Sequence, residues 1–552
     1  MSWSKAPRVL RSQNVAAYLP FDLILVVLAF AALLSGVPVA VALGGTSVMV
    51  GVLGSLLGVF DPVLLFAIPA RLFGVATGNL LTAVPLFVLM GLVLEKSGLV
   101  SDMIKAVTGA VDAQPSGSRQ TGGSRLPIAV VGVGLLLAAS TGIVGASVVM
   151  LGLLTLKPMI DQGVPPHRAA GVVAATGTMG QIVPPSIVLI VLGDQLSNAY
   201  RTMQLDAGVF APDTVSVSDL FAGGLVPGVL LAACYIVHLA WVGRRDRFAF
   251  LADVVEDDTS ELTVIKQTVK ETFWYRIVPL AAPLALIVSV LGSILMGLAT
   301  PTEAASVGLI ATLVLVALRR EASNRRASKL GLLVVAVASA AFSITLNAPS
   351  VLAIGLFACS SGALLALVFL GVQRLVRDQQ FATVLIEAAH LTAMIFFIVF
   401  AASVFALVFR GFGGDERLTA LFEILPGGTY GALFFVMVAI FLLGFFLEFL
   451  EICTLIVPLV APVLLALPMG DGSPMNPVWL GILIALNLQT SFLTPPFGVS
   501  LFYLRSVAPA GMNDWTLYRG VAPFIALQLF VLVAVFFVPP LATALPNWLF
   551  QG

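Results

Sequence analysis

The chain has 552 residues, of which 59% are hydrophobic and 10% are charged. Soluble domains carry about 25% charged residues, so this composition excludes a soluble globular protein and indicates a polytopic membrane protein. The 28 basic and 28 acidic residues balance, so nothing in the net charge suggests nucleic-acid binding. The three cysteines and three histidines lie far apart, which argues against a metal site built from them, and no nucleophile–base constellation indicates an enzyme.

The N-terminal part of the chain begins with about twenty polar residues that lack a cleavage site after an apolar core. We therefore expect no removable signal peptide, and we expect the first membrane helix to direct insertion. The apolar stretch 21–60 fits either one long tilted helix or two shorter ones. A membrane helix follows at 80–94, and a polar loop at 111–125.

The stretch 126–161 is apolar, but it has a small, polar middle and basic residues beyond both ends. At about 1.5 Å per residue, it could cross about 30 Å of hydrocarbon almost twice. Because the two flanks are alike, the pattern predicts a re-entrant helical hairpin with its tip at mid-membrane. A plain pair of crossings is the alternative.

A hydrophobic segment from 168 to 192 is interrupted by Gly177, Gly180 and the pair Pro184-Pro185. Proline has no N–H and its ring clashes with the preceding turn, so the pair ends a helix and frees backbone carbonyls. In lipid such groups are tolerated only where protein or a water-filled cavity satisfies them. The segment therefore predicts a broken membrane helix at a binding site.

Charge places the loops of the remaining crossings. The loops 243–276 and 319–329 are basic, so the positive-inside rule puts both in the cytoplasm. Glu303 follows a proline turn, and we expect it to cap the next helix. The further crossings are expected at 220–242, 277–298, 308–318, 330–346, 351–372, 381–409 and 521–538.

The same design recurs near the other end of the chain. The apolar stretch 433–467 predicts a second hairpin, which enters from the outside because its far side, 468–477, carries no Lys or Arg. A second broken helix follows at 478–503, cut at Pro495-Pro496. The sequence therefore predicts an all-α polytopic membrane protein with inverted repeats, two re-entrant helical hairpins and two broken transmembrane helices, as in secondary transporters.

Seven motifs of these segments resemble the large membrane subunit (the M, or DctM-like, subunit) of the tripartite ATP-independent periplasmic (TRAP) transporters. The motifs are PLFVLMG (85–91), STGIVGASV (140–148), GTMGQIVPPS (177–186), ATPTEAA (299–305), GFFLEFLEI (444–452), VPLVAPVL (457–464) and LTPPFG (493–498). The pair Glu448 and Glu451, followed by Ile-Cys-Thr, resembles the branch that handles mannitol, chloroaromatic acids or 2-oxo acids.

The resemblance implies an elevator-type transporter in the bacterial inner membrane. In that family, sodium drives the uptake of organic acids delivered by a periplasmic binding protein (P), and a small membrane subunit (Q) supports the large one. Only about twenty residues precede the first helix here, so we expect the small subunit to be a separate chain. The family usually has Asp at the position of Glu448. A stand-alone sodium- or proton-coupled elevator carrier that needs no binding protein is the alternative.

The expected domain organisation alternates scaffold and transport segments. The transport domain consists of the two hairpins and the two broken helices, and the other helices form the scaffold. The divisions are N-terminal scaffold helices at 1–110, the first transport half at 111–217, scaffold helices with an extra two-helix insertion at about 330–372 within 218–428, the second transport half at 429–508, and a C-terminal helix at 509–552.

Sodium, the expected coupling ion, prefers oxygen ligands, which freed carbonyls, hydroxyls and amide oxygens supply at hairpin tips and helix breaks. The alternative for any one hydroxyl is a bond back to its own helix. The first site is expected among Ser140, Thr141, Gly142, Gly145, Ser147, Thr176, Thr178 and Gly180. The second is expected among Glu448, Thr454, Gln489, Thr490 and Thr494.

A carboxylate substrate would find the positive N-terminus of a helix after each break. Arg505 would add a full charge, and snorkelling to the interface is its alternative. An intramembrane carboxylate indicates function, so Glu448 is expected to balance the coupling ion, with proton coupling left open. The expected substrate-binding residues are Gln181, Pro184, Pro185, Ser186, Pro495, Pro496, Gly498 and Arg505.

Overall fold

The computed structural model describes residues 20–78, 82–104, 126–141, 144–253, 270–319, 351–470, 472–509 and 511–550. Within these ranges the secondary structure is helical apart from one isolated β-bridge, and eight helices are long and apolar enough to cross a membrane. The expected all-α polytopic class is therefore confirmed. The expected loop 111–125 and the expected crossing 330–346 lie outside the described residues.

The N-terminal apolar stretch forms two helices, which decides between the two alternatives for it. α1 (Phe21–Leu34) and α2 (Val39–Leu56) pack against each other and are joined by a tight turn. Gly36 adopts a left-handed φ of 84° in this turn, which a residue without a Cβ does at no steric cost. Two short helices, α3 (Pro62–Phe66) and α4 (Ile68–Ala76), follow.

The first half of the chain is interrupted at the predicted break before Pro184. α11 continues to Asp206, beyond the hydrophobic segment expected to end at residue 192. Leu196 and Ala199 are buried and three residues apart, so packing of one helical face sustains the helix through a polar stretch. The elements are α5 (Ala83–Lys96), α7 (Leu126–Thr141), α8 (Val144–Leu151), a π-helical turn (Gly152–Leu156), α9 (Lys157–Asp161), α10 (Pro166–Thr178), the 3-10 turn η4 (Met179–Gln181) and α11 (Ile187–Asp206).

Three helices follow: α12 (Val217–Asp253), α13 (Lys270–Leu295) and α14 (Pro301–Leu318). The loop expected from residue 243 is wrong at its start, because α12 continues through Gly243 and the charged residues after it to Asp253. α14 begins at Pro301 rather than at 308. The Glu303 carboxylate accepts the backbone N–H of Thr300 at 2.8 Å in a capping box, which confirms the expected cap.

The second half repeats the interruption before Pro495 and adds two helices that the sequence did not predict, α18 and α25. α18 meets α19 at 115°, so the chain turns sharply before the expected second hairpin. The elements are α16 (Val351–Arg377), α17 (Phe381–Gly411), α18 (Gly414–Ile424), α19 (Gly428–Leu443), α20 (Phe449–Glu451), a π-helical turn (Ile452–Ile456), α21 (Val457–Ala466), α22 (Pro477–Leu493), α23 (Val499–Val507), α24 (Asp514–Phe537) and α25 (Pro540–Phe550).

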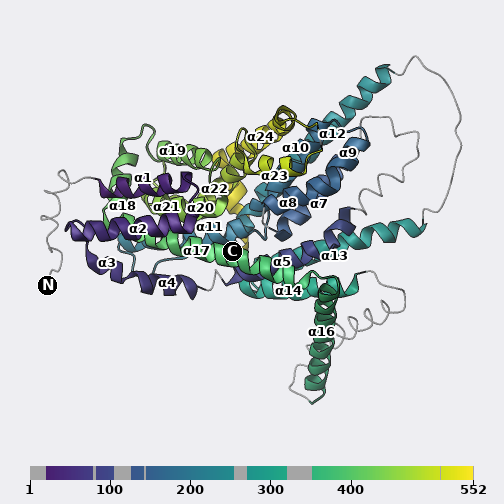
Figure 1. Ribbon diagram of the computed structural model, residues 1–552, viewed down its shortest axis with the longest axis horizontal. Helices are drawn as coiled ribbons and strands as arrows, with labels where there is room; N and C mark the ends of the chain where they lie inside the picture. The colour runs from purple at the N-terminus through teal and green to yellow at the C-terminus, as the bar shows by residue number, and fades with distance from the viewer. Residues whose placement is uncertain are drawn as a thin grey trace.

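Figure 1 shows how these elements surround the two breaks. α7, α8, α10, α12 and α24 gather on one side of the molecule, and α1, α2, α18 and α19 on the other. α11, which contacts both α20 and α22, lies with these two helices between the two groups. α16 projects from the body and packs on α14 (Figure 1). The two interrupted helices are thus brought into the centre of the fold.

Candidate binding site

The first break lies entirely inside the protein, and residues 169–193 are all buried. α10 ends in the turn η4, an irregular segment follows, and α11 restarts after Ser186. The peptide bond between Pro184 and Pro185 is cis, as is the one between Pro495 and Pro496 in the second break. The Ser186 hydroxyl donates to the Gln181 carbonyl at 3.1 Å, so a side chain after the break satisfies a carbonyl that the break frees.

Two side chains of the first break carry buried polar atoms with no hydrogen-bond partner. Gln181 is 0% exposed, and neither its amide oxygen nor its amide nitrogen has a partner. The hydroxyl of Thr176, one helical turn earlier, is also buried and unpartnered. Each such group costs about 1 to 3 kcal/mol, so the break keeps polar capacity that the protein itself does not use.

The second break is tied to α19 rather than enclosed on every side. Asn487 donates to the Met437 carbonyl at 2.7 Å, and Ser491 donates to the Phe441 carbonyl at 2.8 Å. Gly444 lies against Ser491 so closely that a Cβ would approach the hydroxyl oxygen within 2.2 Å. These contacts hold the end of α19 against the end of α22.

Beyond the second Pro-Pro pair the arrangement parallels the first. The Ser500 hydroxyl donates to the Phe492 carbonyl at 2.8 Å, as Ser186 does to Gln181, and sequence reasoning had not singled out Ser500. Gln489 is 0% exposed, and both polar atoms of its amide are unpartnered. Each break therefore combines a serine that satisfies a freed carbonyl with a glutamine that has no partner.

The helices that restart after the breaks have N-termini without a side-chain cap. The N-cap residues are Ser186 for α11 and Gly498 for α23, and neither makes a side-chain capping bond. The first N–H groups of a helix have no partner within it, and the helix dipole favours negative charge there. Both ends thus lack a side-chain cap, and the binding of an anion there stays a prediction.

Glu448 is the N-cap of α20 and does not lie on a continuous helix with Glu451. The Glu451 carboxylate accepts the Glu448 backbone N–H at 3.0 Å in a capping box. Glu448 is exposed, and its carboxylate is hydrogen-bonded by Tyr503 of α23. A Cβ on Gly145 would lie 2.7 Å from the ring of Tyr503. Tyr503 therefore joins the start of α8 to that of α20, which no sequence signal had indicated.

Several expected sodium ligands donate to their own helices. The hydroxyls of Thr454, Thr490 and Thr494 donate to the carbonyls of Leu450, Leu486 and Thr490 at 2.6, 2.8 and 2.7 Å. A hydroxyl that donates in this way keeps its oxygen lone pairs. Thr178 donates to the Ala175 carbonyl at 2.8 Å and accepts the Gln528 amide at 3.2 Å.

The other expected site residues have varied surroundings. Ser147 and Gly145 are buried in α8, and Gly180 is buried in η4. Arg505 is 67% exposed at the end of α23 and pairs with Asp514 at 3.0 Å. The Ser140 and Thr141 side chains and the whole of Gly142 lie outside the described residues.

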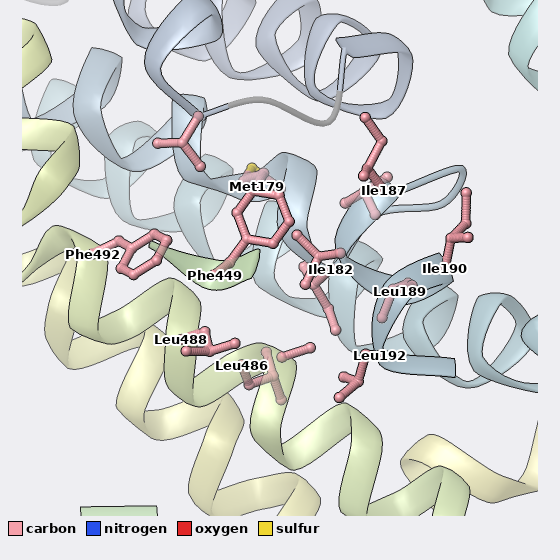
Figure 2. Packing of buried hydrophobic residues seen from close by; sticks show 14 of the residues in the cluster. Met179, Ile182, Ile187, Leu189, Ile190, Leu192, Phe449, Leu486, Leu488 and Phe492 are labelled. Carbon is pink, nitrogen blue, oxygen red and sulfur yellow. The ribbon is translucent and has the colours of Figure 1, made fainter. Parts of the chain in front are cut away.

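The structure brings the two breaks together although they lie in opposite halves of the chain. η4 packs against α22, and α11 packs against α20 and α22. Figure 2 shows Met179 and Ile182 of the first break gathered with Phe449 of α20 and Phe492 of α22. Ile182, next to Gln181, and Leu488, next to Gln489, thus belong to one apolar cluster.

An all-helical membrane fold with two interrupted helices meeting at its centre belongs to the class of membrane transport proteins. The family model of the tripartite ATP-independent periplasmic transporter, DctM component, matches residues 26–362 and 351–541. The chain therefore belongs to this family, as its motifs predicted.

Similar proteins agree with this assignment. The chain is 27% identical to a C4-dicarboxylate TRAP transporter large permease protein of Pseudomonas aeruginosa, over 89% of this chain and 91% of that protein. It is 26% identical to an isethionate TRAP transporter permease protein DctMQ of Oleidesulfovibrio alaskensis, over 83% of this chain and 56% of that one. Both relatives are named as permeases and not as enzymes, in line with the sequence prediction. The YdaH transporter of Alcanivorax borkumensis shares the fold, with a TM-score of 0.50 and 14% identity over 96% of this chain and 98% of that one.

Proposed function

We propose that the chain is the large membrane subunit of a sodium-coupled importer in the bacterial inner membrane. In this proposal a periplasmic binding protein delivers an organic acid, and the two halves around the breaks form an elevator-type transport domain. One observation carries the proposal. The two adjacent breaks hold buried polar atoms of Thr176, Gln181 and Gln489 that the protein leaves without partners.

The substrate is proposed to be an organic anion. Ser186 and Gly498 begin helices whose first N–H groups have no side-chain cap, and such ends favour carboxylates. The relative from Pseudomonas aeruginosa carries C4-dicarboxylate in its name, which supports an acid as the substrate class. In this scheme the uncapped N–H groups hold the carboxylate, and the amide nitrogens of Gln181 and Gln489 orient the rest of the molecule.

Sodium is proposed as the coupling ion because the breaks offer oxygen. The amide oxygens of Gln181 and Gln489 and the Thr176 hydroxyl are buried and unpartnered, so a cation would replace no existing bond. Glu448 supplies a carboxylate beside the second break and balances the charge of the ion. Its hydrogen bond from Tyr503 holds that carboxylate in place.

An elevator movement is supported by the contact between α21 and the scaffold helix α17. Leu455 of the π-helical turn and Leu459 of α21 pack into an apolar cluster with Phe405 of α17, so movement at this contact would shift mainly apolar side chains and break one hydrogen bond. Arg410, at the end of α17, donates to the Pro458 carbonyl at 3.2 Å. That carbonyl is free because its helical partner would be the N–H of Pro462, which proline lacks. The two stretches 126–161 and 433–467 are proposed as the re-entrant hairpins of the moving body.

The partners are proposed to be a periplasmic binding protein and a small membrane subunit encoded as a separate chain. The name of the relative DctMQ joins two subunit names, and this chain spans 56% of it. Co-purification with a separately expressed small subunit tests this arrangement.

The decisive experiment is uptake into proteoliposomes that hold this chain and its small subunit. A labelled organic acid is presented with and without the binding protein, under an inward sodium gradient. Uptake that needs both supports the proposal. Uptake without the binding protein would favour a stand-alone carrier, and uptake driven by a proton gradient alone would contradict sodium coupling. Asn487→Leu is a useful control. Asn487 already has a hydrogen-bond partner, so its substitution should change stability rather than coupling.

A further inference from the structure

One buried amide connects the first break to two helices outside it. Gln528 of α24 is 1% exposed, and its side-chain nitrogen donates to the Tyr235 hydroxyl at 2.9 Å and to the Thr178 hydroxyl at 3.2 Å. Tyr235 belongs to α12 and is completely buried. Thr178 is the last residue of α10, directly before the break. Three segments far apart in the chain therefore meet at one side chain.

The backbones of α10 and α24 approach so closely that Gln528 has little freedom. A Cβ on Gly171 would lie 2.1 Å from the Gly520 carbonyl oxygen, so both helices need glycine where they cross. Gly520, Phe524 and Gln528 are four residues apart and share one face of α24. Phe524 meets the ring of Tyr235 edge-on, with centroids 5.0 Å apart. The crossing thus delivers the amide to Thr178 in a fixed position.

The hydrogen bonds of Thr178 define the direction of its oxygen. The hydroxyl hydrogen is used in the bond to the Ala175 carbonyl, so only lone pairs remain. The Gln528 amide occupies one of these lone pairs. These two bonds set the direction in which the remaining lone pair of the Thr178 oxygen points. The amide oxygen of Gln528 is itself buried and unpartnered, which would destabilise a residue present only for packing.

We propose that Gln528 is a positioning residue of the transport site, which acts through Thr178 to orient the first break for its ligand. It touches neither the expected ion nor the substrate. The inference rests on the proposed function, because it assigns Thr178 to the ion site of the first break. It also implies that α24 and α12 hold the break as one unit with α10.

The test uses the complete complex in proteoliposomes and four proteins: wild type, Gln528→Leu, Thr178→Val and the double variant. Gln528→Leu should raise the sodium concentration for half-maximal uptake about fivefold to tenfold, the effect of one buried hydrogen bond, and leave the maximal rate within about twofold. In the Thr178→Val background, Gln528→Leu should cause no further change in the sodium concentration for half-maximal uptake. Tyr235→Phe, which keeps the bond between Gln528 and Thr178, should shift the half-maximal concentration less.

Hydrogen exchange measured by mass spectrometry provides a readout that does not depend on the coupling ion. Gln528→Leu should speed amide exchange in residues 176–183 and leave residues 487–494 of the second break unchanged. Three results would overturn the inference. They are an equal shift of the half-maximal sodium concentration in the Thr178→Val background, a loss of maximal rate alone, and unchanged amide exchange at residues 176–183. If wild-type uptake does not depend on sodium, the proposed function fails, and the exchange comparison alone decides the role of Gln528. If Gln528→Leu does not accumulate in the membrane, Gln528→Met takes its place in these tests.

Discussion

The two helix breaks arise from the same sequence device but lie in different surroundings. Around the first break, residues 169–193, from α10 to the first part of α11, are all buried. α7 and α24 pack against α10. Around the second, Phe497 is 59% exposed, and Glu448 beside it is exposed as well. The Pro-Pro pair sets where each helix stops, and the neighbouring helices set whether that point is accessible.

This difference indicates how a ligand reaches the site. A charged side chain facing hydrocarbon costs roughly 3 kcal/mol, so the exposed Glu448 should face water rather than lipid. The first break holds Gln181 in a fully enclosed position. The proposed function therefore predicts that ligands enter beside the second break and are held against the first.

The largest expected contrast is in chemical accessibility. Phe497→Cys should react with a water-soluble thiol reagent at least about a hundredfold faster than Ile182→Cys, because burial limits access to the thiolate. Both variants are made in a chain lacking Cys359, which is exposed. Mass spectrometry of the labelled peptide gives the rates. Equal labelling of the two positions would remove the distinction between an open and an enclosed break.

Substitution of the unpartnered glutamines should lower uptake without lowering stability. Gln181→Met and Gln489→Met should each lower uptake about a hundredfold through lost ligand contacts, roughly 2 to 3 kcal/mol. The midpoint of thermal unfolding should stay level or rise, because an unsatisfied buried group is removed.

Asn487→Leu is the matched control for the glutamine variants. It removes the side-chain hydrogen bond to the Met437 carbonyl, so the unfolding midpoint should fall. A fall of the same size for the glutamine variants would show that they too are structural.

The contact between Tyr503 and Glu448 should matter less, because both side chains are partly exposed. Tyr503→Phe removes the hydrogen bond and should weaken the apparent sodium affinity about threefold to tenfold, the range for one ordinary hydrogen bond, because a partly exposed carboxylate can bond to water instead. Gly145→Ala should have a similar effect, because its Cβ would displace the tyrosine ring. Uptake titrated with sodium measures both. An unchanged affinity in Tyr503→Phe would exclude this link between the two tips.

The smallest effect is expected at Arg505. Its pair with Asp514 is exposed on both sides, and exposed pairs contribute about 0 to 1 kcal/mol. Arg505→Gln should change the unfolding midpoint little and uptake less than about twofold, since the residue lies two turns beyond Gly498. A loss of uptake comparable to that of the glutamine variants would return Arg505 to the substrate site.

The helix interruptions and the Glu303 cap were predictable because their causes are local. Proline lacks an N–H wherever it stands, and a Thr-Pro-Thr-Glu turn caps the helix that it begins. The ends of α11 and α12, and the existence of α18 and α25, were not predictable from polarity. Those helices are fixed by packing partners, such as the face of Leu196, that a linear pattern does not contain.

The sequence by itself determined the membrane class through its composition and the family through its motifs. It also determined the position of both breaks, since proline chemistry acts within a few residues of chain. Only the tertiary structure decided which polar groups use their hydrogen bonds. Thr490 and Thr494 donate to their own helix, whereas Gln181 and Gln489 have no partner. The roles of Tyr503 and Gln528 likewise depend on contacts between distant segments, and a hydrogen bond exists only where the fold places a donor against an acceptor.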